Sequence, residues 1–351
     1  MLYIHSVKCA VAGATGYLGT ELLRLLSTHP SLEVAVVQGD TTAGRMLGDV
    51  VPALAPAFGD LVVGALDASE LERAEVVFVA LPSGTSQDVV GRLVGRVRLV
   101  VDLGADFRLK DASLYPRWYG WEHSRPDLLE VARYGLPELS GAALRDAELV
   151  AAPGCYVTAA ALALAPLVRE GVVDAGGVIV DAASGTSGAG KAVSANLHHP
   201  LANERFAAYG LLTHRHTPEM EQAIGAGVLF TPHLAPMTRG ILATCYARPA
   251  PLAHGGSPKT TEELVALLDD LYAGAPFVNV QGPDCLPSTA DCYGSNVAHL
   301  TARLDQRTGW VIVLCAIDNL VKGGAGQALQ AANLALGLPE AAGLPLAALT
   351  P

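Results

Sequence analysis

Cys155 is the residue whose setting most clearly indicates chemistry. It stands in the segment APGCY, residues 152–156, where a Pro-Gly turn leads into the Ala/Leu-rich run 157–169. This pattern predicts a cysteine in the first turn of a helix, where unpaired N–H groups and the helix dipole favour negative charge. Such a position lowers the pKa of a thiol and makes a thiolate nucleophile available. We therefore predict that Cys155 is the catalytic nucleophile.

The segment HRHTPE, at 214–219, carries two histidines that flank an arginine. A thiolate needs an acid/base partner that deprotonates it and protonates the oxyanion formed on a neighbouring carbonyl. Either His214 or His216 could serve, and the sequence does not decide between them. The spacing of these histidines and of those at 198, 199 and 233 matches no standard set of metal ligands, so we predict no metal site.

A glycine-rich loop, GATGYLG at residues 13–19, lies near the N-terminus. It follows a short apolar strand at 8–12 and precedes a helix at 17–28 and a second strand at 32–37. Glycines at these positions allow a tight turn and close approach of the backbone to a dinucleotide. The alternative is a glycine-rich turn without a ligand, because the spacing is G-x-x-G-x-x-G. A thiol, a dinucleotide and an imidazole together indicate aldehyde-level redox chemistry through a thioester.

Further strands are expected at 76–80, 98–103 and 148–152, with a helix at 86–94. Alternating strands and helices predict a parallel, doubly wound Rossmann sheet with right-handed crossovers. Ligands of such sheets bind at the C-terminal ends of the strands. Residues 82–84, 104–108 and 153–155 should lie there, which would place Cys155 beside a nicotinamide.

The second half of the chain shows a different pattern of predicted strands. Strands rich in β-branched residues are expected at 177–181, 228–231, 240–247 and 310–317, which predict a mixed, largely antiparallel sheet with helices on one face. Residues 323–336 are expected to form a final amphipathic helix that packs on the first domain, and residues 249–257 a loop. We therefore predict a dinucleotide-binding domain at 1–153, completed by the C-terminal helix 323–351, and an α+β catalytic domain at 154–322.

Composition limits the function classes. A chain of 351 residues, of which 51% are hydrophobic and 16% charged, is expected to form two globular domains. The net charge of −11 excludes a general nucleic-acid binder, and an anionic substrate must meet local cations. The candidates are Arg108, Lys191, Arg215 and Arg239. Arg108 could clamp a phosphate or carboxylate, or form a surface ion pair with Asp106 or Asp111.

The cysteines and the apolar segments predict a cytoplasmic location. Six scattered cysteines fit a reducing compartment, and residues 1–8 lack the basic start of a signal peptide. Residues 149–168 carry no charge, but Pro153, Gly154 and Pro166 interrupt them, so we expect a strand and a buried helix without a membrane span.

The loop 184–191 (SGTSGAGK) lacks the Walker spacing, and its N–H groups could form an oxyanion nest.

The chain resembles the N-acetyl-gamma-glutamyl-phosphate reductases, arginine-pathway relatives of the aspartate-semialdehyde dehydrogenases. The matching segments run through almost the whole chain and are highly specific together. They are residues 13–19, 103–108, 153–156, 184–190, 208–209, 214–219, 232–241 (PHLAPMTRGI), 294–296 and 316–323 (AIDNLVKG).

The resemblance implies a Rossmann domain joined to a catalytic domain of the semialdehyde or glyceraldehyde-phosphate dehydrogenase type, in a homo-oligomer, dimer or tetramer. It implies NADPH-dependent reduction of an acyl phosphate through a Cys155 thioester, with the pair His214 and His216 as acid/base. The cofactor-binding residues expected are Gly13, Thr15, Gly16, Tyr17, Leu18, Gly19, Asp40, Thr41, Ser184, Gly185 and, by the nicotinamide carboxamide, Asn319. The substrate-binding residues expected are Arg108, Ser187, Gly188, Lys191, Tyr209 and Arg215.

One segment departs from the family pattern. Relatives often place Ser or Arg after the second strand to hold a 2′-phosphate, whereas this chain has QGDTT at 38–42. The separation of Asp40 from Gly19 is near that at which an acid binds the ribose 2′-hydroxyl of NAD. Thr41, Thr42 and Arg45 could still serve a phosphate, so NADP is expected and NAD stays open.

Other functions fit parts of the pattern. A lysine-pathway reductase acting on a carrier-linked aminoadipyl phosphate, or an aspartate-semialdehyde dehydrogenase, would keep the chemistry and change the substrate. Residues 203–206 (NERF) and 208–209 resemble the arginine-pathway enzymes more closely. A nucleotide-sensing Rossmann protein without catalysis and a Cys/His hydrolase without a cofactor are the alternatives from other classes.

Overall fold

The computed structural model describes residues 6–250 and 260–350 and divides into two compact units. The first unit comprises Met1–Pro153 and Gly324–Leu344, and the second comprises Gly154–Gly323 and Pro345–Pro351. Most of the loop predicted at 249–257, and residues 1–5 of the N-terminal segment, lie outside the described residues.

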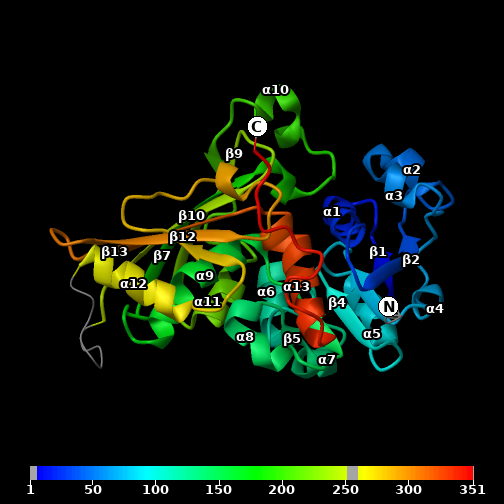
Figure 1. Cartoon of the computed structure of the whole chain (residues 1–351), viewed down its shortest axis with the longest axis horizontal. Helices are drawn as coiled ribbons and strands as arrows, with labels where there is room; N and C mark the ends of the chain where they lie inside the picture. The colour runs from blue at the N-terminus through cyan, green and yellow to red at the C-terminus, as the bar shows by residue number, and fades with distance from the viewer. Residues whose placement is uncertain (1–5, 251–259, 351) are drawn as a thin grey trace. The chain divides into compact units, whose positions relative to one another are not determined.

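The first unit is built on a six-stranded parallel sheet. Its order is β2 (Leu32–Gln38), β1 (Val7–Ala12), β3 (Val76–Val79), β4 (Leu99–Asp102), β6 (Leu149–Ala151) and β5 (Arg133–Tyr134). Alternate residues of a strand point to opposite faces. Ala10, Val77 and Val100 pack with Val90 and Leu93 of α5 (Ser86–Leu93). Helices α1 (Tyr17–Leu26) and α13 (Gly326–Ala335) also pack on the sheet (Figure 1). The predicted doubly wound Rossmann sheet is confirmed.

Shorter helices complete the first unit. They are α2 (Leu47–Val50), α3 (Ala55–Phe58), α4 (Ala68–Leu71), α6 (Tyr115–Tyr119), α7 (Pro126–Val131) and α8 (Pro137–Leu144).

The C-terminal helix differs from the prediction. A π-helical turn, Val321–Ala325, precedes α13, and nine of the ten residues of α13 are buried. The expectation of an amphipathic helix is wrong, because polar side chains of α13 are also enclosed. Asn333, for example, lies 3.1 Å from the ring nitrogen Nε2 of His29, and Gln327 donates to the carbonyl of Gly135. Residues 345–351 group with the second unit, so the segment after the helix does not stay with α13.

The second unit is built on a seven-stranded mixed sheet. Its order is β11 (Val278–Val280), β12 (Ala298–Asp305), β13 (Trp310–Ile317), β10 (Ile241–Ala247), β7 (Val178–Gly185), β9 (Val228–Ala235) and β8 (Ala207–Ala208). The β7–β9 and β11–β12 pairs are parallel and the others antiparallel. Helices α9 (Cys155–Arg169), α11 (Thr217–Ile224) and α12 (Thr261–Leu271) cover one face, as predicted (Figure 1). The short helix α10 (His199–Ala202) lies in the excursion between β7 and β8.

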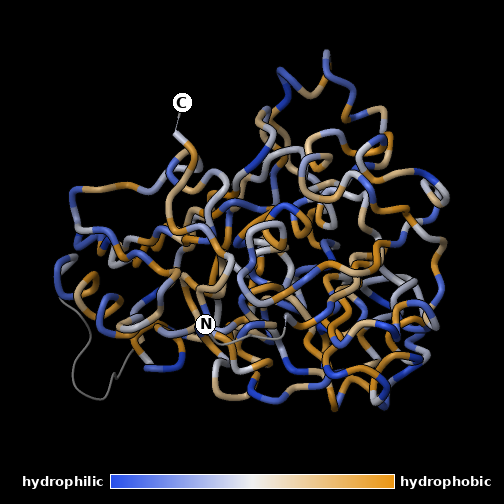
Figure 2. The backbone as a smooth tube through the Cα atoms, turned by 45° about the vertical axis from the view of Figure 1, so that its right-hand side comes forward, coloured by the Kyte–Doolittle hydropathy of each residue, from blue (hydrophilic) through white to orange (hydrophobic). Residues whose placement is uncertain are grey.

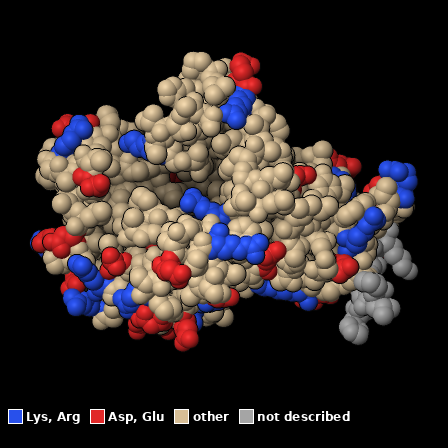
Figure 3. Space-filling model, turned by 180° about the vertical axis from the view of Figure 1, so that it is seen from behind, with Lys and Arg blue, Asp and Glu red and all other residues tan. Residues whose placement is uncertain are grey.

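Polar and charged segments lie largely at the periphery, while interior strands and helices are hydrophobic (Figure 2). On the face drawn in Figure 3, acidic and basic side chains are scattered among large uncharged areas. Within residues 6–250 and 260–350, no helix is long and apolar enough to cross a membrane. The uncharged stretch 149–168 forms strand β6 and most of α9, as predicted.

Candidate functional site

Cys155 is the first residue of α9, directly after the N-cap Gly154, so its predicted place in the first helical turn is confirmed. Its side chain is partly exposed. Four other cysteines are buried, and burial raises the pKa of the Cys9 and Cys292 thiols to about 12. Such thiols stay protonated and inert at neutral pH. Cys155 therefore combines access to a reactant with a helix N-terminus that favours a thiolate.

The start of α11 lies against Gly154. A Cβ built on Gly154 would lie 2.5 Å from Nε2 of His216, so the imidazole packs on the backbone that immediately precedes Cys155. Further along α11, Glu219 is fully buried and its Oε1 accepts a 2.9 Å hydrogen bond from the N–H of Gly154. Two residues of the HRHTPE segment, His216 and Glu219, therefore contact the backbone of Gly154 next to the nucleophile.

His214 lies in a different environment. Its Nδ1 accepts a 3.1 Å hydrogen bond from the backbone N–H of His216. Burial, together with the neighbouring Arg215 charge, lowers the pKa of His214 to about 4. The neutral ring with Nδ1 as acceptor carries its proton on Nε2, so near neutral pH this ring can donate there and does not take up a proton.

Aromatic rings surround these histidines. The rings of Tyr156 and Phe230 lie 5.7 and 5.2 Å from that of His214, and the Tyr156 ring lies 6.0 Å from that of His216. The hydroxyl of Tyr156 donates to the carbonyl of His233 at 2.7 Å and lies 3.3 Å from the hydroxyl of Tyr209. Burial raises the pKa of Tyr156 strongly and that of Tyr209 to about 12, so both remain protonated hydrogen-bond donors near neutral pH.

The π-helical turn Val321–Ala325 approaches Cys155 from another side. A Cβ built on Gly323 would lie 2.9 Å from Cβ of Cys155, which no real side chain tolerates without a shift. The turn is closed by the N–H of Gly323 donating to the carbonyl of Asp318, and the buried Asp318 carboxylate accepts the N–H groups of Leu320 and Val321. π-turns often occur at functional sites, and this one brings bare backbone against the nucleophile.

The neighbouring Asn319 ties three segments together. Its Oδ1 accepts a 2.6 Å hydrogen bond from the N–H of Gly240, and its Nδ2 donates to Oγ of Ser187 at 2.9 Å. The amide therefore fixes the turn that follows β7 relative to β10. The contact with a nicotinamide carboxamide stays a prediction for Asn319.

The oxyanion nest predicted in the loop 184–191 is wrong for three of its N–H groups. Those of Gly185, Thr186 and Ser187 donate to the carbonyls of Gly240, Met237 and Thr238. They therefore stabilise the loop and are not directed at a ligand. Binding through side chains of this loop, or through Gly188, stays a prediction.

The candidate cations have different surroundings. In the second unit, Arg239 pairs with the buried Asp318 at 3.0 Å, whereas Lys191 and Arg215 are exposed. In the first unit, the guanidinium of Arg108 is buried and donates to the carbonyls of Ala152 and Leu103. The surface alternative for Arg108 is therefore wrong, and its role toward substrate stays a prediction.

The glycine loop of the first unit has the geometry that a dinucleotide requires. A Cβ on Gly13 (φ +79°) would lie 2.3 Å from the carbonyl oxygen of Ala80, and one on Gly19 would lie 2.2 Å from that of Gly13. These glycines let β1, β3 and α1 pack closely. Gly16 is the N-cap of the ten-residue α1 and has more open space. A phosphate can therefore approach the first N–H groups of the helix. The residues present fit a dinucleotide phosphate.

The segment after β2 lies beside this loop. Oγ1 of Thr42 is 3.1 Å from Oγ1 of Thr15, which links the two turns. Asp40 and Thr41 are exposed just beyond the end of β2. Contact of either residue with a ribose 2′-hydroxyl or its phosphate stays a prediction.

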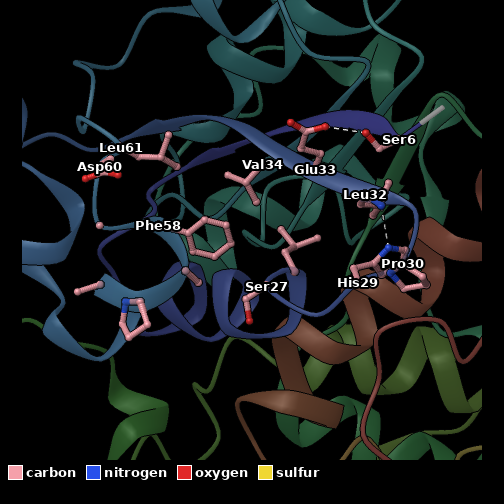
Figure 4. Close-up of a pocket in the computed structure, with 15 residues that line it drawn as sticks. Ser6, Ser27, His29, Pro30, Leu32, Glu33, Val34, Phe58, Asp60 and Leu61 are labelled. Atoms are coloured by element: carbon pink, nitrogen blue, oxygen red, sulfur yellow. Dashed lines mark hydrogen bonds between the residues drawn. The ribbon is translucent and has the colours of Figure 1, made fainter. Parts of the chain in front are cut away.

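A cavity of about 550 Å³ in the first unit does not suit anionic reactants (Figure 4). It lies between β2, the end of α1 and α3, and among the described residues Glu33 and Asp60 supply its only charged side chains, because burial lowers the pKa of His29 and keeps that imidazole neutral. A second cavity, of about 310 Å³, opens beside Tyr209 in the second unit. Among residues 6–250 and 260–350 no group of three or more His, Cys, Asp or Glu residues could hold a metal ion.

Sequence reasoning gave no role to Glu219, Tyr156 or Gly323. Glu219 and Tyr156 stand inside motifs that were recognised, so their nearness in sequence to His216 and Cys155 was an available signal. Gly323 lies far from Cys155 along the chain, and nothing in the sequence indicates that the two touch.

Comparisons with known proteins find a semialdehyde dehydrogenase family model for each half of the chain. The family model described as "Semialdehyde dehydrogenase, NAD binding domain" matches residues 8–147, and "Semialdehyde dehydrogenase, dimerisation domain" matches residues 155–319. The chain is 47% identical over 346 residues to the N-acetyl-gamma-glutamyl-phosphate reductase of Symbiobacterium thermophilum, covering 97% of each protein. It is 47% identical to that of Desulforudis audaxviator, covering 98% of this chain and all of that protein.

Solved structures agree in fold at low sequence identity. Aspartate semialdehyde dehydrogenase II from Vibrio cholerae, complexed with ASA, superposes with a TM-score of 0.68 at 16% identity, covering 94% of this chain and 98% of that one. The aspartate semialdehyde dehydrogenase with NADP from Candida albicans gives 0.66 at 16% identity, with the same coverage. These two comparisons show the fold alone.

Proposed function

Because this chain belongs to the semialdehyde dehydrogenase family, and within it to the N-acetyl-gamma-glutamyl-phosphate reductases, we propose that it reduces N-acetyl-γ-glutamyl phosphate to N-acetylglutamate 5-semialdehyde in arginine biosynthesis. Phosphate is the second product. The observation that carries this proposal is the partly exposed Cys155 at the start of α9, with the His216 ring packed on the preceding Gly154 and with Gly323 packed on Cys155 itself.

The residues of the second unit carry the covalent chemistry. The Cys155 thiolate attacks the acyl carbon, the carbon–oxygen bond to phosphate breaks, and a thioester remains. When bound, a reduced nicotinamide would supply the hydride that reduces this acyl group, and the glycine loop of the first unit would hold the cofactor phosphates. Collapse of the resulting thiohemiacetal then breaks the carbon–sulfur bond, releases the aldehyde and regenerates the Cys155 thiolate.

His216 is the acid/base in this scheme. Its ring lies on Gly154, next to the nucleophile, whereas the Nδ1 of His214 is committed to the N–H of His216. His214 and Tyr209 act as donors that orient neighbouring groups, and Glu219 is a positioning residue because it holds the N–H of Gly154. Loss of the His216 imidazole should therefore reduce turnover more than loss of the His214 imidazole.

The first unit binds NADP in this proposal. The glycine loop with Gly13, Gly16 and Gly19 accommodates the phosphates, and Thr41 stands where a 2′-phosphate would be read. Asp40 is the feature that favours NAD, because a carboxylate repels a 2′-phosphate and accepts a 2′-hydroxyl. A higher kcat/KM with NAD than with NADP would overturn the NADP assignment and leave the reaction unchanged.

A homo-oligomer is proposed through the sheet of the second unit. Helices α9, α11 and α12 lie on one face, toward which Ala243 and Cys245 of β10 point. Leu242, Thr244 and Tyr246 alternate with them and are only partly buried. A second copy could cover this opposite face. The matched dimerisation-domain model supports the same arrangement. Light scattering that gives a monomer at working concentration would overturn it.

A cytoplasmic location is proposed from the thiols. The six cysteines, all within the described residues, form no disulfide, and the proposed nucleophile must stay reduced to act. A reducing compartment meets this requirement.

A reverse-direction spectrophotometric assay tests the function. N-acetylglutamate semialdehyde, phosphate and NADP or NAD are supplied to the parent protein and to Cys155→Ala, with aspartate semialdehyde and an aminoadipate semialdehyde as competing substrates. The parent should reduce the nicotinamide fastest with the N-acetylated substrate, and Cys155→Ala should lose turnover while it still binds cofactor. A faster rate with either competing aldehyde would overturn the substrate assignment.

A further inference from the structure

A series of contacts joins the C-terminal segment 345–349 to the nucleophile, and all of its members belong to the second unit. At its centre lies the fully buried carboxylate of Asp318, which the proposed reaction does not use. We propose that Asp318 is a positioning residue for Cys155, and that the segment 345–349 holds this carboxylate in place through the backbone of Gly294. The proposal rests on the function proposed above, because it concerns the thiol that carries out that reaction.

The two oxygens of the Asp318 carboxylate bind different segments. Oδ1 accepts hydrogen bonds of 2.8 and 3.1 Å from the N–H groups of Leu320 and Val321, where the π-helical turn begins. Oδ2 accepts a 2.7 Å hydrogen bond from the N–H of Gly294. An ionised carboxylate offers two acceptor oxygens, whereas the amide of asparagine offers one oxygen and two donors. The link between the turn and Gly294 therefore requires a carboxylate.

The π-helical turn lies directly against the nucleophile. The carbonyl of Asp318 accepts a 2.9 Å hydrogen bond from the N–H of Gly323, so this residue holds the turn by its main chain as well. A Cβ built on Gly323 would lie 2.9 Å from Cβ and 3.3 Å from Cα of Cys155. Because closely packed groups transmit small displacements, a shift of the turn changes the position of the thiol. Displacing a reacting group by about 1 Å can reduce turnover roughly a hundredfold.

Arg239 is the cation that accompanies this carboxylate. Its Nη2 lies 3.0 Å from Oδ1 of Asp318, and only 14% of the Arg239 side chain is exposed. The guanidinium also lies over the ring of Tyr293, 5.4 Å from the ring centroid. A cation in this position attracts both the carboxylate and the face of the aromatic ring. Arg239 thus ties Asp318 to the residue that precedes Gly294.

The C-terminal segment binds the same stretch of backbone. The carbonyl of Tyr293 accepts a 2.8 Å hydrogen bond from the N–H of Leu349. The carbonyl of Pro345 accepts one of 2.9 Å from the N–H of Asn296. The side chain of Leu349 packs on Gly294, where a built Cβ would lie 3.1 Å from its Cγ and Cδ1. Gly294 has a φ of +76°, which glycine adopts without strain, and these contacts fix the backbone N–H that the carboxylate accepts.

Asp318→Asn tests the carboxylate. The variant is compared with the parent in the reverse-direction assay, and alkylation of Cys155 by iodoacetamide is followed by peptide mass spectrometry, because Cys285 is exposed as well. We expect kcat to fall about tenfold with an unchanged KM for the aldehyde, since a shift of a fraction of an ångström costs part of the hundredfold that about 1 Å costs. The alkylation rate of Cys155 should change by about the same factor, while that of Cys285 should stay constant.

Leu349 tests the C-terminal segment. Leu349→Ser removes the apolar contact with Gly294, whereas Leu349→Met keeps an apolar side chain of similar volume. We expect Leu349→Ser to lower kcat about threefold, less than Asp318→Asn because it acts through one further contact, and Leu349→Met to keep the parent value. Leu286→Ser is the matched control and should change neither kcat nor the alkylation rate, since the leucines at 286 and 349 are 66% and 64% exposed.

A double variant tests whether the segment acts through Asp318. If it acts on the thiol only through this carboxylate, Leu349→Ser should lower kcat much less in the Asp318→Asn background than in the parent. Denaturant unfolding is measured for every variant. A merely structural role would lower stability while kcat and the alkylation rate of the folded protein stay unchanged, and that result would overturn the proposal.

The outcomes separate this proposal from the function itself. A parent protein without reductase activity contradicts the proposed function, and the alkylation rates still test the positioning of Cys155. An active parent whose variants keep kcat and the alkylation rate overturns the positioning role and leaves the function intact. Equal effects of Leu349→Ser in both backgrounds overturn the action of the segment through Asp318. If Asp318→Asn does not fold, the comparison of Leu349→Ser with Leu349→Met decides.

Discussion

Gly154→Ala places a methyl group where the structure has no room for one. Gly154 has the extended backbone angles φ -70 and ψ 147. Alanine adopts this conformation without strain, so the backbone itself tolerates the change. The added Cβ would lie 2.5, 2.7 and 2.9 Å from Nε2, Cε1 and Cδ2 of His216. Carbon contacts are comfortable at about 3.5–4.0 Å, so the imidazole must move by roughly 1 Å.

The cost follows from this displacement. Overpacking by one methyl group in a filled site typically costs about 1–3 kcal/mol. Three ring atoms of the buried His216 clash at once, so we expect Gly154→Ala to lower the free energy of unfolding by about 2 kcal/mol. Displacing a catalytic group by about 1 Å can reduce turnover roughly a hundredfold, and we expect a loss of kcat of that order with cofactor affinity unchanged.

A double-mutant cycle assigns the effect to the imidazole. Denaturant unfolding is measured for the parent, Gly154→Ala, His216→Ala and the double variant. Once the ring is removed, Gly154→Ala should cost close to nothing, which gives a coupling energy of about 2 kcal/mol. Gly177→Ala, where an added Cβ meets nothing within 4 Å, is the control and should be near neutral. An equal cost in both backgrounds, or a normal kcat in Gly154→Ala, would refute the reasoning.

Three further predictions concern other positions. Gly323→Ala drives a methyl group to 2.9 Å from Cβ of Cys155, so iodoacetamide should alkylate that thiol at a changed rate and kcat should fall; an unchanged rate with normal kcat would contradict the contact. Burial holds the pKa of His214 at about 4, below its ordinary 6.5. The unfolded chain therefore binds this proton more tightly, and stability should fall as pH decreases from 6.5 to 4. In His214→Gln the free energy of unfolding should change less between pH 6.5 and 4, by at most about 3 kcal/mol, when unfolding is measured as a function of pH. Burial and the nearby Asp106 raise the pKa of Asp102 to about 7. Stability should therefore decline as pH rises from the ordinary carboxyl range through 7, and Asp102→Asn should lose this decline in the same titrations.

Local patterns in the sequence predict much of the fold. The strand–glycine–helix unit at the N-terminus and the helix that starts at Cys155 are confirmed, because short-range spacing and turn residues determine them. The strand β12 and helix α12 were not predicted, although the sequence carries a start signal for α12: Thr260 caps the helix and accepts a hydrogen bond from the N–H of Glu263. The all-round burial of α13 could not be seen either, because the groups that satisfy its polar side chains come from distant segments.

The site was predictable in its residue types and less so in its geometry. Cys155 and the histidine pair stand out by sequence, yet the choice of His216 rests on its contact with Gly154, which a linear pattern cannot show. The oxyanion nest is wrong for the N–H groups of Gly185, Thr186 and Ser187, because backbone N–H groups bond to carbonyls when these are near. Those carbonyls belong to the segment 237–240. The alternative of a surface ion pair for Arg108 is wrong for the same reason. Its buried guanidinium donates hydrogen bonds to the carbonyls of Ala152 and Leu103.

Covalent capture at Cys155 tests the proposed reaction most directly. The protein is mixed with N-acetylglutamate semialdehyde and oxidised cofactor in the absence of phosphate, so that the thioester forms and has no phosphate to attack it. Peptide mass spectrometry should then find an N-acetylglutamyl group on the peptide that carries Cys155, and added phosphate should remove it. Turnover retained in Cys155→Ala, or an acyl group found only on another residue, would contradict the mechanism.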